Sequence, residues 1–215
     1  MHITRRKALV SAGMFGSLAL VGVIGATAVS AQSDGATAYT AALNALPNTR
    51  GRGTASLLLS GDKRTLTVKI EASGLDSGGV HLSHIHGRSA GGEPVDSTCP
   101  TIAEDTDGDG FVELAEGAVR YGPILIDFMN IDPDQDGEVQ FSKTIRLTGD
   151  ENILPLTNRH IVIHGMNVGA VGANTPGEVN GTAEYKVLLP VLCGEITQAG
   201  NPGDAMRFRE KPRGN

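Results

Sequence analysis

The chain has 215 residues with 24 acidic and 18 basic side chains, a formal charge of −6 at pH 7. A content of 40% apolar and only 20% charged residues is enough for a packed core, and it excludes a disordered acidic tail or a coiled coil. Twenty-nine glycines, few aromatic residues and no tryptophan are typical of a turn-rich β protein rather than a helical bundle. We therefore expect one domain, or two small ones, built mainly from strands.

Residues 1–31 have the layout of a secretory signal peptide. Arg5, Arg6 and Lys7 precede a run without charge that ends in Val29-Ser30-Ala31. These small residues predict cleavage after Ala31 and an exported protein that is secreted, periplasmic or at the cell surface, with no membrane span left. The basic start fits both the general and the twin-arginine export route. An uncleaved anchor is the alternative, because the run is long enough to span a bilayer.

Two cysteines, Cys99 and Cys193, follow the expected signal peptide. An even pair outside the cytoplasm predicts one disulfide, and two buried thiols are the alternative. Cleavage would remove three basic residues and no acidic residue, so the exported part is more acidic than the whole chain. Nucleic acid is therefore not expected as a partner.

Most of the excess acidity lies in residues 104–138, which hold eleven acidic residues and one basic residue, Arg120. Residues 105–116 place carboxylates at positions 1, 3, 5, 9 and 12 of a twelve-residue loop with glycine at position 6, the pattern of an EF-hand calcium loop. Cys99-Pro100 does not predict an entering helix, so we expect a lone loop inserted in a β protein. The alternative is a solvated acidic turn. The expected calcium ligands are Asp105, Asp107, Asp109, the Phe111 carbonyl, Glu113 and Glu116.

A second acidic run, containing Asp132, Asp134 and Asp136, repeats the opening of this pattern. Lys143 stands at its twelfth position, so the bidentate carboxylate is missing. A polar hairpin turn is favoured here over a weaker calcium site.

Eight short runs rich in β-branched and aliphatic residues are separated by Gly, Asn and Asp. They predict an all-β domain over residues 32–197, a Greek-key β-sandwich or flattened barrel with residues 104–138 as an inserted acidic region. One short helix is expected near Leu114–Arg120, and the polar tail 198–215 is expected to be disordered. The expected strands are Tyr39–Leu46, Gly53–Ser60, Leu66–Ala72, Val80–His86, Glu138–Leu147, Arg159–His164, Gly181–Leu188 and Val191–Ile196.

The histidines outside the signal peptide fall in two places. His84 and His86 are two residues apart and share one face of a strand, whereas His81 points to the opposite face. His160 and His164 also share a face, but about 13 Å separates them, so only one can join the pair. We choose His164, because a glycine follows it as one follows His86, which would place both histidines at strand ends. Three neutral imidazoles suit copper or zinc, and structural or surface histidines are the alternative.

These motifs resemble the copper/zinc superoxide dismutase superfamily. The relevant segments are Val80-His81-Leu-Ser-His84-Ile-His86-Gly87, then Asn158–His164, then Leu192-Cys193-Gly194-Glu195-Ile196, in the same order as in that family. Residues 39–55, with Leu66-Thr-Val68 and the histidine motif, are equally similar to a CHRD (chordin-type) domain. The resemblance implies a β-sandwich from about residue 39 to 196. It also implies copper at His84, His86 and His164, a bracing role for His81 and a Cys99–Cys193 disulfide.

The departures from the family pattern point to a copper-only or degenerate relative. No histidine lies between His86 and His160, so the zinc histidines are absent and zinc is not expected. Asp127 falls near the zinc aspartate position but lacks those partners, and Pro190 stands where the family has an anion-guiding arginine. Superoxide dismutation is therefore one expected activity, with superoxide or metal ions as partners. The alternatives are a non-catalytic, calcium-stabilised extracellular module that binds a protein or wall component, and a copper storage or delivery protein.

Overall fold

The computed structural model describes residues 35–169 and 184–200. The expected signal peptide and residues 201–215 of the expected disordered tail lie outside the described residues. Within them the fold is all-β, with short helical pieces in the connections. The strands are β1 (Thr37–Ala45), β2 (Arg52–Leu59), β3 (Thr65–Ser73), β4 (Leu82–Ala90), β5 (Glu93–Val95), β6 (Ile124–Asn130), β7 (Val139–Arg146), β8 (Arg159–Asn167), β9 (Tyr185–Glu195) and β10 (Thr197–Gln198). The helical pieces are the 3₁₀ turns η1 (Ile102–Glu104) and η2 (Leu156–Asn158) and the helix α1 (Leu114–Tyr121).

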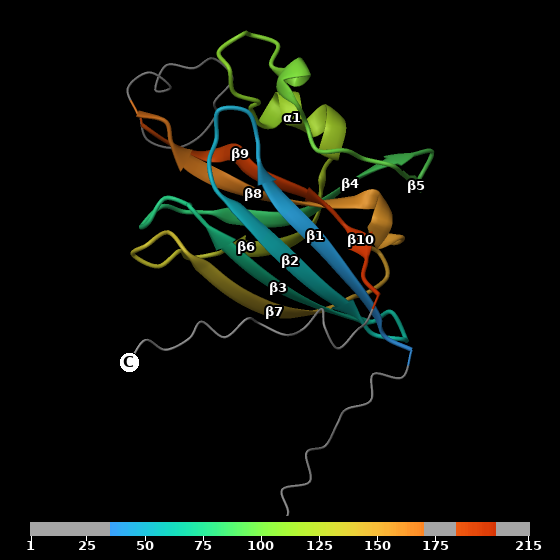
Figure 1. Ribbon diagram of the computed structural model, residues 1–215. Coiled ribbons are helices and arrows are strands. Elements are labelled where there is room, and N and C mark those ends of the chain that lie inside the picture. The colour runs from blue at the N-terminus through green and yellow to red at the C-terminus, as the bar shows by residue number, and fades with distance from the viewer. Residues whose placement is uncertain (1–34, 170–183, 201–215) are drawn as a thin grey trace, which may run out of the picture. The chain divides into compact units, whose positions relative to one another are not determined.

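The strands form one antiparallel sheet in the order β5-β4-β8-β9-β1-β2-β3-β7, with β6 paired to β4 and β10 to β1 (Figure 1). Over the described residues no ladder joins β6 to β7, so the sheet is not closed into a barrel. Side chains nevertheless connect these strands. The Phe128 and Phe141 ring centroids lie 6.2 Å apart, and the Lys143 ammonium donates to the Asp127 and Phe128 carbonyls. The sheet therefore folds over on itself as a sandwich, which confirms the expected fold class.

Alternating side chains fill the space between the two halves of the sheet. In β3, Leu66, Val68 and Ile70 point inward and are fully buried, while the residues between them are partly exposed. β4 and β8 contribute Ile85 and Ile161 to the same core. Because strand side chains alternate between faces, the histidines next to these isoleucines lie on the outer face of the sheet.

The strand expectations were wrong at several places. The short strands β5 and β10 were not expected, and β10 includes Gln198, the first residue of the expected disordered tail. β6 was not expected, because its sequence lies in the acidic region that was assigned to an insert; it pairs with β4, so residues 124–130 belong to the sheet. The runs Gly181–Leu188 and Val191–Ile196 were expected as separate strands. From Tyr185 onward they form the single strand β9, which passes through Pro190 beside a register shift in its pairing with β8.

The helix expected near Leu114–Arg120 is confirmed as α1, which extends one residue further. Gly122 ends it with a φ of 80°, a backbone conformation that glycine adopts without strain. No helix within residues 35–169 and 184–200 is long and apolar enough to cross a membrane.

Cys99 and Cys193 form the expected disulfide. It joins the segment after β5 to β9 across a sequence separation of 94 residues, with the two Cα atoms 5.8 Å apart. A link over so long a loop restricts the unfolded chain strongly.

Reduction of this disulfide should lower the free energy of unfolding by about 4 to 5 kcal/mol in the chain-entropy model, because the unfolded chain regains the freedom of a long loop. Urea unfolding of the metal-free protein with and without reductant measures the change. A Cys99→Ser/Cys193→Ser variant, measured without reductant, is the control for effects of the reductant itself. An unchanged midpoint would contradict the expectation.

Candidate metal sites

The structure brings His84 and His86 of β4 together with His164 of β8. Each offers one ring nitrogen, and these nitrogens lie within 4.8 Å of one another. The ring centroids of His84 and His164 are 5.1 Å apart, and those of His84 and His86 are 5.4 Å apart. The three residues retain only 5%, 2% and 1% of their surface exposed, in that order of sequence number.

Backbone carbonyls fix two of these rings. The Nδ1 of His86 donates to the Gly122 carbonyl at 2.9 Å, and the Nδ1 of His164 donates to the Leu188 carbonyl at 2.8 Å. With the hydrogen on Nδ1, the neutral ring carries its lone pair on Nε2. In both residues this Nε2 is buried and has no hydrogen-bond partner.

His84 presents its other ring nitrogen. Its Nε2 lies 3.5 Å from an Asp127 carboxylate oxygen, while its Nδ1 is buried without a hydrogen-bond partner. The cluster thus has two free Nε2 atoms and one free Nδ1. Buried polar atoms without partners are rare and costly, and a metal ion bound by all three nitrogens would satisfy them together.

Burial keeps the three imidazoles neutral, which is the form that binds metal. Burial lowers the pKa of His86 to about 4, although the hydrogen bond to Gly122 opposes this shift. Burial lowers the pKa of His164 to about 3. The pKa of His84 is also lowered by burial, against the attraction of Asp127.

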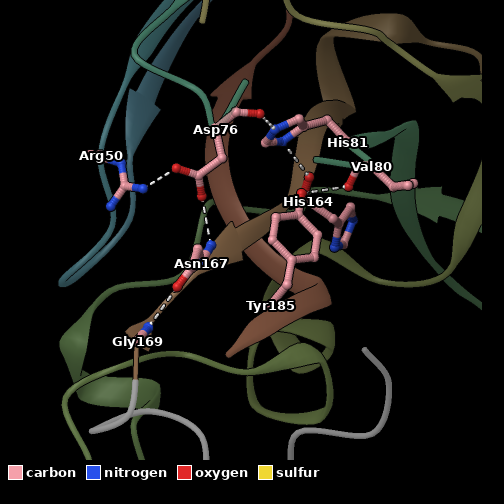
Figure 2. A network of polar contacts seen from close by, with 8 residues as sticks. All are labelled: Arg50, Asp76, Val80, His81, His164, Asn167, Gly169 and Tyr185. Carbon is pink, nitrogen blue, oxygen red and sulfur yellow. Dashed lines mark hydrogen bonds and ion pairs between the residues drawn. The ribbon is translucent and has the colours of Figure 1, made fainter. Parts of the chain in front are cut away.

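His81, on the opposite side of the chain from His84, braces the backbone of His164. Its Nδ1 lies 3.1 Å from the His164 carbonyl and its Nε2 lies 3.0 Å from the Asp76 carbonyl, so the ring spans two backbone segments (Figure 2). The Asp76 carboxylate in turn binds the Arg50 guanidinium and the Asn167 amide. His81 therefore contacts the backbone of His164 and of Asp76, and its role in bracing a metal site stays a prediction.

The glycine after His164 is required by space and by backbone conformation. Gly165 has a φ of 100°, which favours glycine. A Cβ at this position would collide with the Val80 carbonyl and the Tyr185 hydroxyl, which are hydrogen-bonded to each other (Figure 2). Neither glycine marks a strand end, however, because β8 continues to Asn167 and β4 continues past Gly87 to Ala90, so the reason for choosing His164 was wrong although His164 does join the cluster.

The other histidine of β8 does not join the cluster. His160 is paired directly with His86 in the β4–β8 register, but its Nδ1 is 2.7 Å from the Ser97 hydroxyl and its Nε2 is 3.6 Å from a Glu195 carboxylate oxygen. The structure therefore separates the two histidines of this strand as their spacing requires.

Sequence reasoning missed the contact between Asp127 and His84. The two residues are cross-strand partners. The β4–β6 register shifts just before His84 and again just after Ile85, so Phe128 and Leu125 of β6 have no partner residue in β4. Such bulges re-aim side chains next to functional sites. No sequence pattern revealed a bulge in a strand that was itself unexpected.

The acidic loop brings its five carboxylates into two overlapping groups. One group contains Asp105, Asp107 and Glu116, and the other contains Asp107, Asp109 and Glu113. Within each group, one carboxylate oxygen of each residue lies within 4.8 Å of those of the other two. The loop also folds around its own carboxylates, which accept hydrogen bonds from its backbone, including Gly108 and Gly110 to Asp105. The Phe111 amide donates to Asp109, and no contact of the Phe111 carbonyl tests its expected ligand role.

Glu113 is the most unusual residue of the loop. It is 1% exposed, and its Oε1 has no hydrogen-bond partner. Burial and the neighbouring Glu116 and Asp109 raise the pKa of Glu113 to about 9. Although burial by itself would raise the pKa of Glu116, hydrogen bonds from Glu113 and Thr106 lower that pKa to about 2. A cation would relieve the crowding of charge that holds a proton on Glu113.

The segments around the loop agree with a lone EF-hand-like loop. The short 3₁₀ turn η1 precedes it in place of an entering helix, and α1 follows it with Glu116 in its first turn. The Asn48 amide, from the β1–β2 connection, donates to the Gly110 carbonyl at 2.7 Å. Calcium itself stays a prediction.

The second acidic run is a tight turn before β7. The Asp134 amide donates to the Glu138 carbonyl, and the Asp134 carboxylate accepts the Asp136 and Glu138 amides. Within the described residues, Asp132, Asp134 and Asp136 form no group of three close ligand atoms. This geometry favours the hairpin turn over a calcium site.

Comparison with known proteins assigns no family. The chain matches neither a protein-family model nor a curated protein. The relation to dismutase-like or CHRD proteins therefore stays a proposal, which depends on the motifs and on the site.

The depressed pKa of His86 predicts a pH-dependent contribution to stability. Between its unfolded pKa near 6.5 and its folded pKa near 4, the unfolded state binds a proton that the folded state does not, so this contribution falls as the pH falls. The stability difference between the metal-free protein and His86→Gln should shrink by about 1 kcal/mol per pH unit in this window. Urea unfolding between pH 7 and 4.5 measures the difference, and a constant or growing difference would contradict the prediction.

Proposed function

We propose that this chain is an exported metal-binding protein of the dismutase-like or CHRD type, with copper at His84, His86 and His164 and calcium in the loop 105–116. One observation carries the copper assignment: three buried, neutral imidazoles bring ring nitrogens within 4.8 Å of one another, each ring has a buried nitrogen without a hydrogen-bond partner, and two have their other nitrogen fixed by a backbone carbonyl. The carbonyls act as the outer partners that orient metal-binding histidines.

The donor set supports copper. Imidazole ligands without carboxylate or thiolate suit copper and zinc rather than calcium or magnesium. Within the described residues no second histidine group is present that would form the zinc subsite of the resembled family. Copper held by the triad would supply one-electron chemistry, oxidising one superoxide to dioxygen and reducing a second, with two protons, to hydrogen peroxide.

Copper storage or delivery is the second candidate, and the burial of the ligands favours it. The three histidines are 1–5% exposed in the described structure, which suits retention of a metal better than frequent encounters with an anion. Pro190 is the β9 partner of His164, so an uncharged residue occupies the position that the resemblance assigns to a guiding arginine.

Export is supported by the pattern of residues 1–31 and by the Cys99–Cys193 disulfide, since disulfides persist in oxidising compartments. If copper does not bind, the calcium loop and the disulfide support the third function, a non-catalytic extracellular module.

The disulfide-bonded protein should retain about one copper per chain after loose metal is removed. The double variant His84→Ala/His86→Ala should retain none, because it keeps one ligand of three, whereas His160→Ala, with a histidine outside the cluster, should retain copper as the wild type does. Elemental analysis gives the stoichiometry. Copper retention by the double variant would refute the proposed site.

A superoxide-decay assay on the copper-loaded protein then separates the first two candidates. Faster decay that is lost in His84→Ala/His86→Ala supports dismutation. Tightly held copper without faster decay supports storage or delivery.

Calcium binding should weaken by about tenfold or more in Glu116→Gln, because the substitution removes the charge of the ligand at position 12. Glu93→Gln is the matched control, since Glu93 is exposed on β5 outside both candidate sites. Isothermal titration with calcium measures both affinities. Equal affinities in the two variants would remove the EF-hand-like assignment.

A further inference from the structure

Helix α1 connects the two candidate sites. At its start, Glu113 is the N-cap residue and Glu116 lies in the first turn, and both carboxylates belong to the acidic loop. At its end, the Gly122 carbonyl accepts the hydrogen bond from Nδ1 of His86 at 2.9 Å, and the Tyr121 ring packs on the His86 ring with centroids 4.7 Å apart. One short helix thus carries calcium-loop ligands at one end and contacts of a copper ligand at the other.

Tyr121 reaches along the whole helix. Its hydroxyl donates to the Leu114 carbonyl at 3.2 Å, so the side chain extends from the last residue of α1 back to the first. Gly117 leaves room for it, because a Cβ there would lie 2.6 Å from the tyrosine ring. The side chain is fully buried, where it contacts the His86 ring and packs with Leu46, Val162 and Cys193. Tyr121 therefore connects the His86 ring to the first turn of the helix.

The geometry of α1 depends on what holds its ends, because the helix has only eight residues and isolated helices of this length are not stable in water. Its first turn lies in the crowded carboxylate cluster. There Glu113, 1% exposed, has a buried oxygen without a hydrogen-bond partner, and its carboxylate belongs to the group that also contains Asp107 and Asp109. This buried oxygen is the observation that points to a cation. A divalent cation bound by Glu113 and Glu116 would remove the repulsion between the carboxylates at the start of the helix.

We propose that a divalent cation in the acidic loop fixes α1 and thereby raises the copper affinity of the histidine site, with Tyr121 as the positioning residue between them. This inference rests on the proposed function. The cation favours the helix position in which Gly122 and Tyr121 hold His86 with its Nε2 toward His84 and His164. The coupling is reciprocal, so copper raises the calcium affinity by the same factor.

The test uses the full exported chain with its disulfide intact, in buffer freed of divalent ions. Copper affinity is measured by competition with a chromophoric chelator, without calcium and with saturating calcium. We expect calcium to tighten copper binding about tenfold, within the usual range of coupling between sites. Calcium titration of the copper-free and copper-loaded protein should give the same factor.

Tyr121→Phe tests the path, because it keeps the ring on His86 and removes the hydroxyl that reaches Leu114. This variant should bind both metals, but calcium should no longer change its copper affinity by more than about twofold. Glu116→Gln should lose the calcium effect at calcium concentrations that saturate the wild type. Glu93→Gln, the matched control, should keep it.

The outcomes separate this inference from the proposed function. If both metals bind and neither changes the affinity of the other, the coupling is refuted while the two sites stand. Coupling that persists in Tyr121→Phe refutes the role of Tyr121. If calcium does not bind the wild type, both the calcium assignment and the coupling fail.

Discussion

The pairing of β4 with β8 is the constraint on which the candidate copper site depends. Its register puts Ile85 opposite Ile161 in the core, and strand alternation then sends the histidines of both strands to the outer face. A slip of one residue would exchange the two sets, burying imidazoles in the core and exposing isoleucines. The hydrophobic core thus selects the face of the sheet on which a metal could bind.

The outer face of the sheet can form a metal site because neighbouring segments of the chain cover the histidines on it. The Gly122 carbonyl after α1 and the Leu188 carbonyl of β9 each hold one ring, and His81 braces the chain at His164 from the other side. The two carbonyls each satisfy one ring nitrogen, of His86 and of His164, and the other nitrogen of each ring stays without a hydrogen-bond partner. Burial then keeps the free nitrogens unprotonated. Position, tautomer and protonation state therefore follow from the same packing.

The sequence contained more of this arrangement than its weak motifs suggest. Period-two spacing placed His84 and His86 on one face and His81 on the other, and the distance between His160 and His164 required a choice between them. The calcium-loop spacing placed the acidic groups close together, and the segment before it did not predict an entering helix. In contrast, β6 was missed. Two bulges interrupt the alternation of buried and exposed residues along this strand, and acidic residues surround the strand in the sequence. The runs on either side of Pro190 were expected as two strands, whereas β9 continues through Pro190 with a shifted register to β8.

The sequence by itself determined the all-β class, the short helix, the cysteine pair and the residues able to hold metal. These follow from local spacing and residue chemistry, which act over a few positions of the chain. Only the tertiary structure decided which nitrogen of each histidine is free, that Asp127 lies against His84, and that α1 connects the acidic loop to His86. Those contacts join residues up to tens of positions apart, through backbone carbonyls and bulges that no side-chain pattern records. They depend on how the sheet folds over its core.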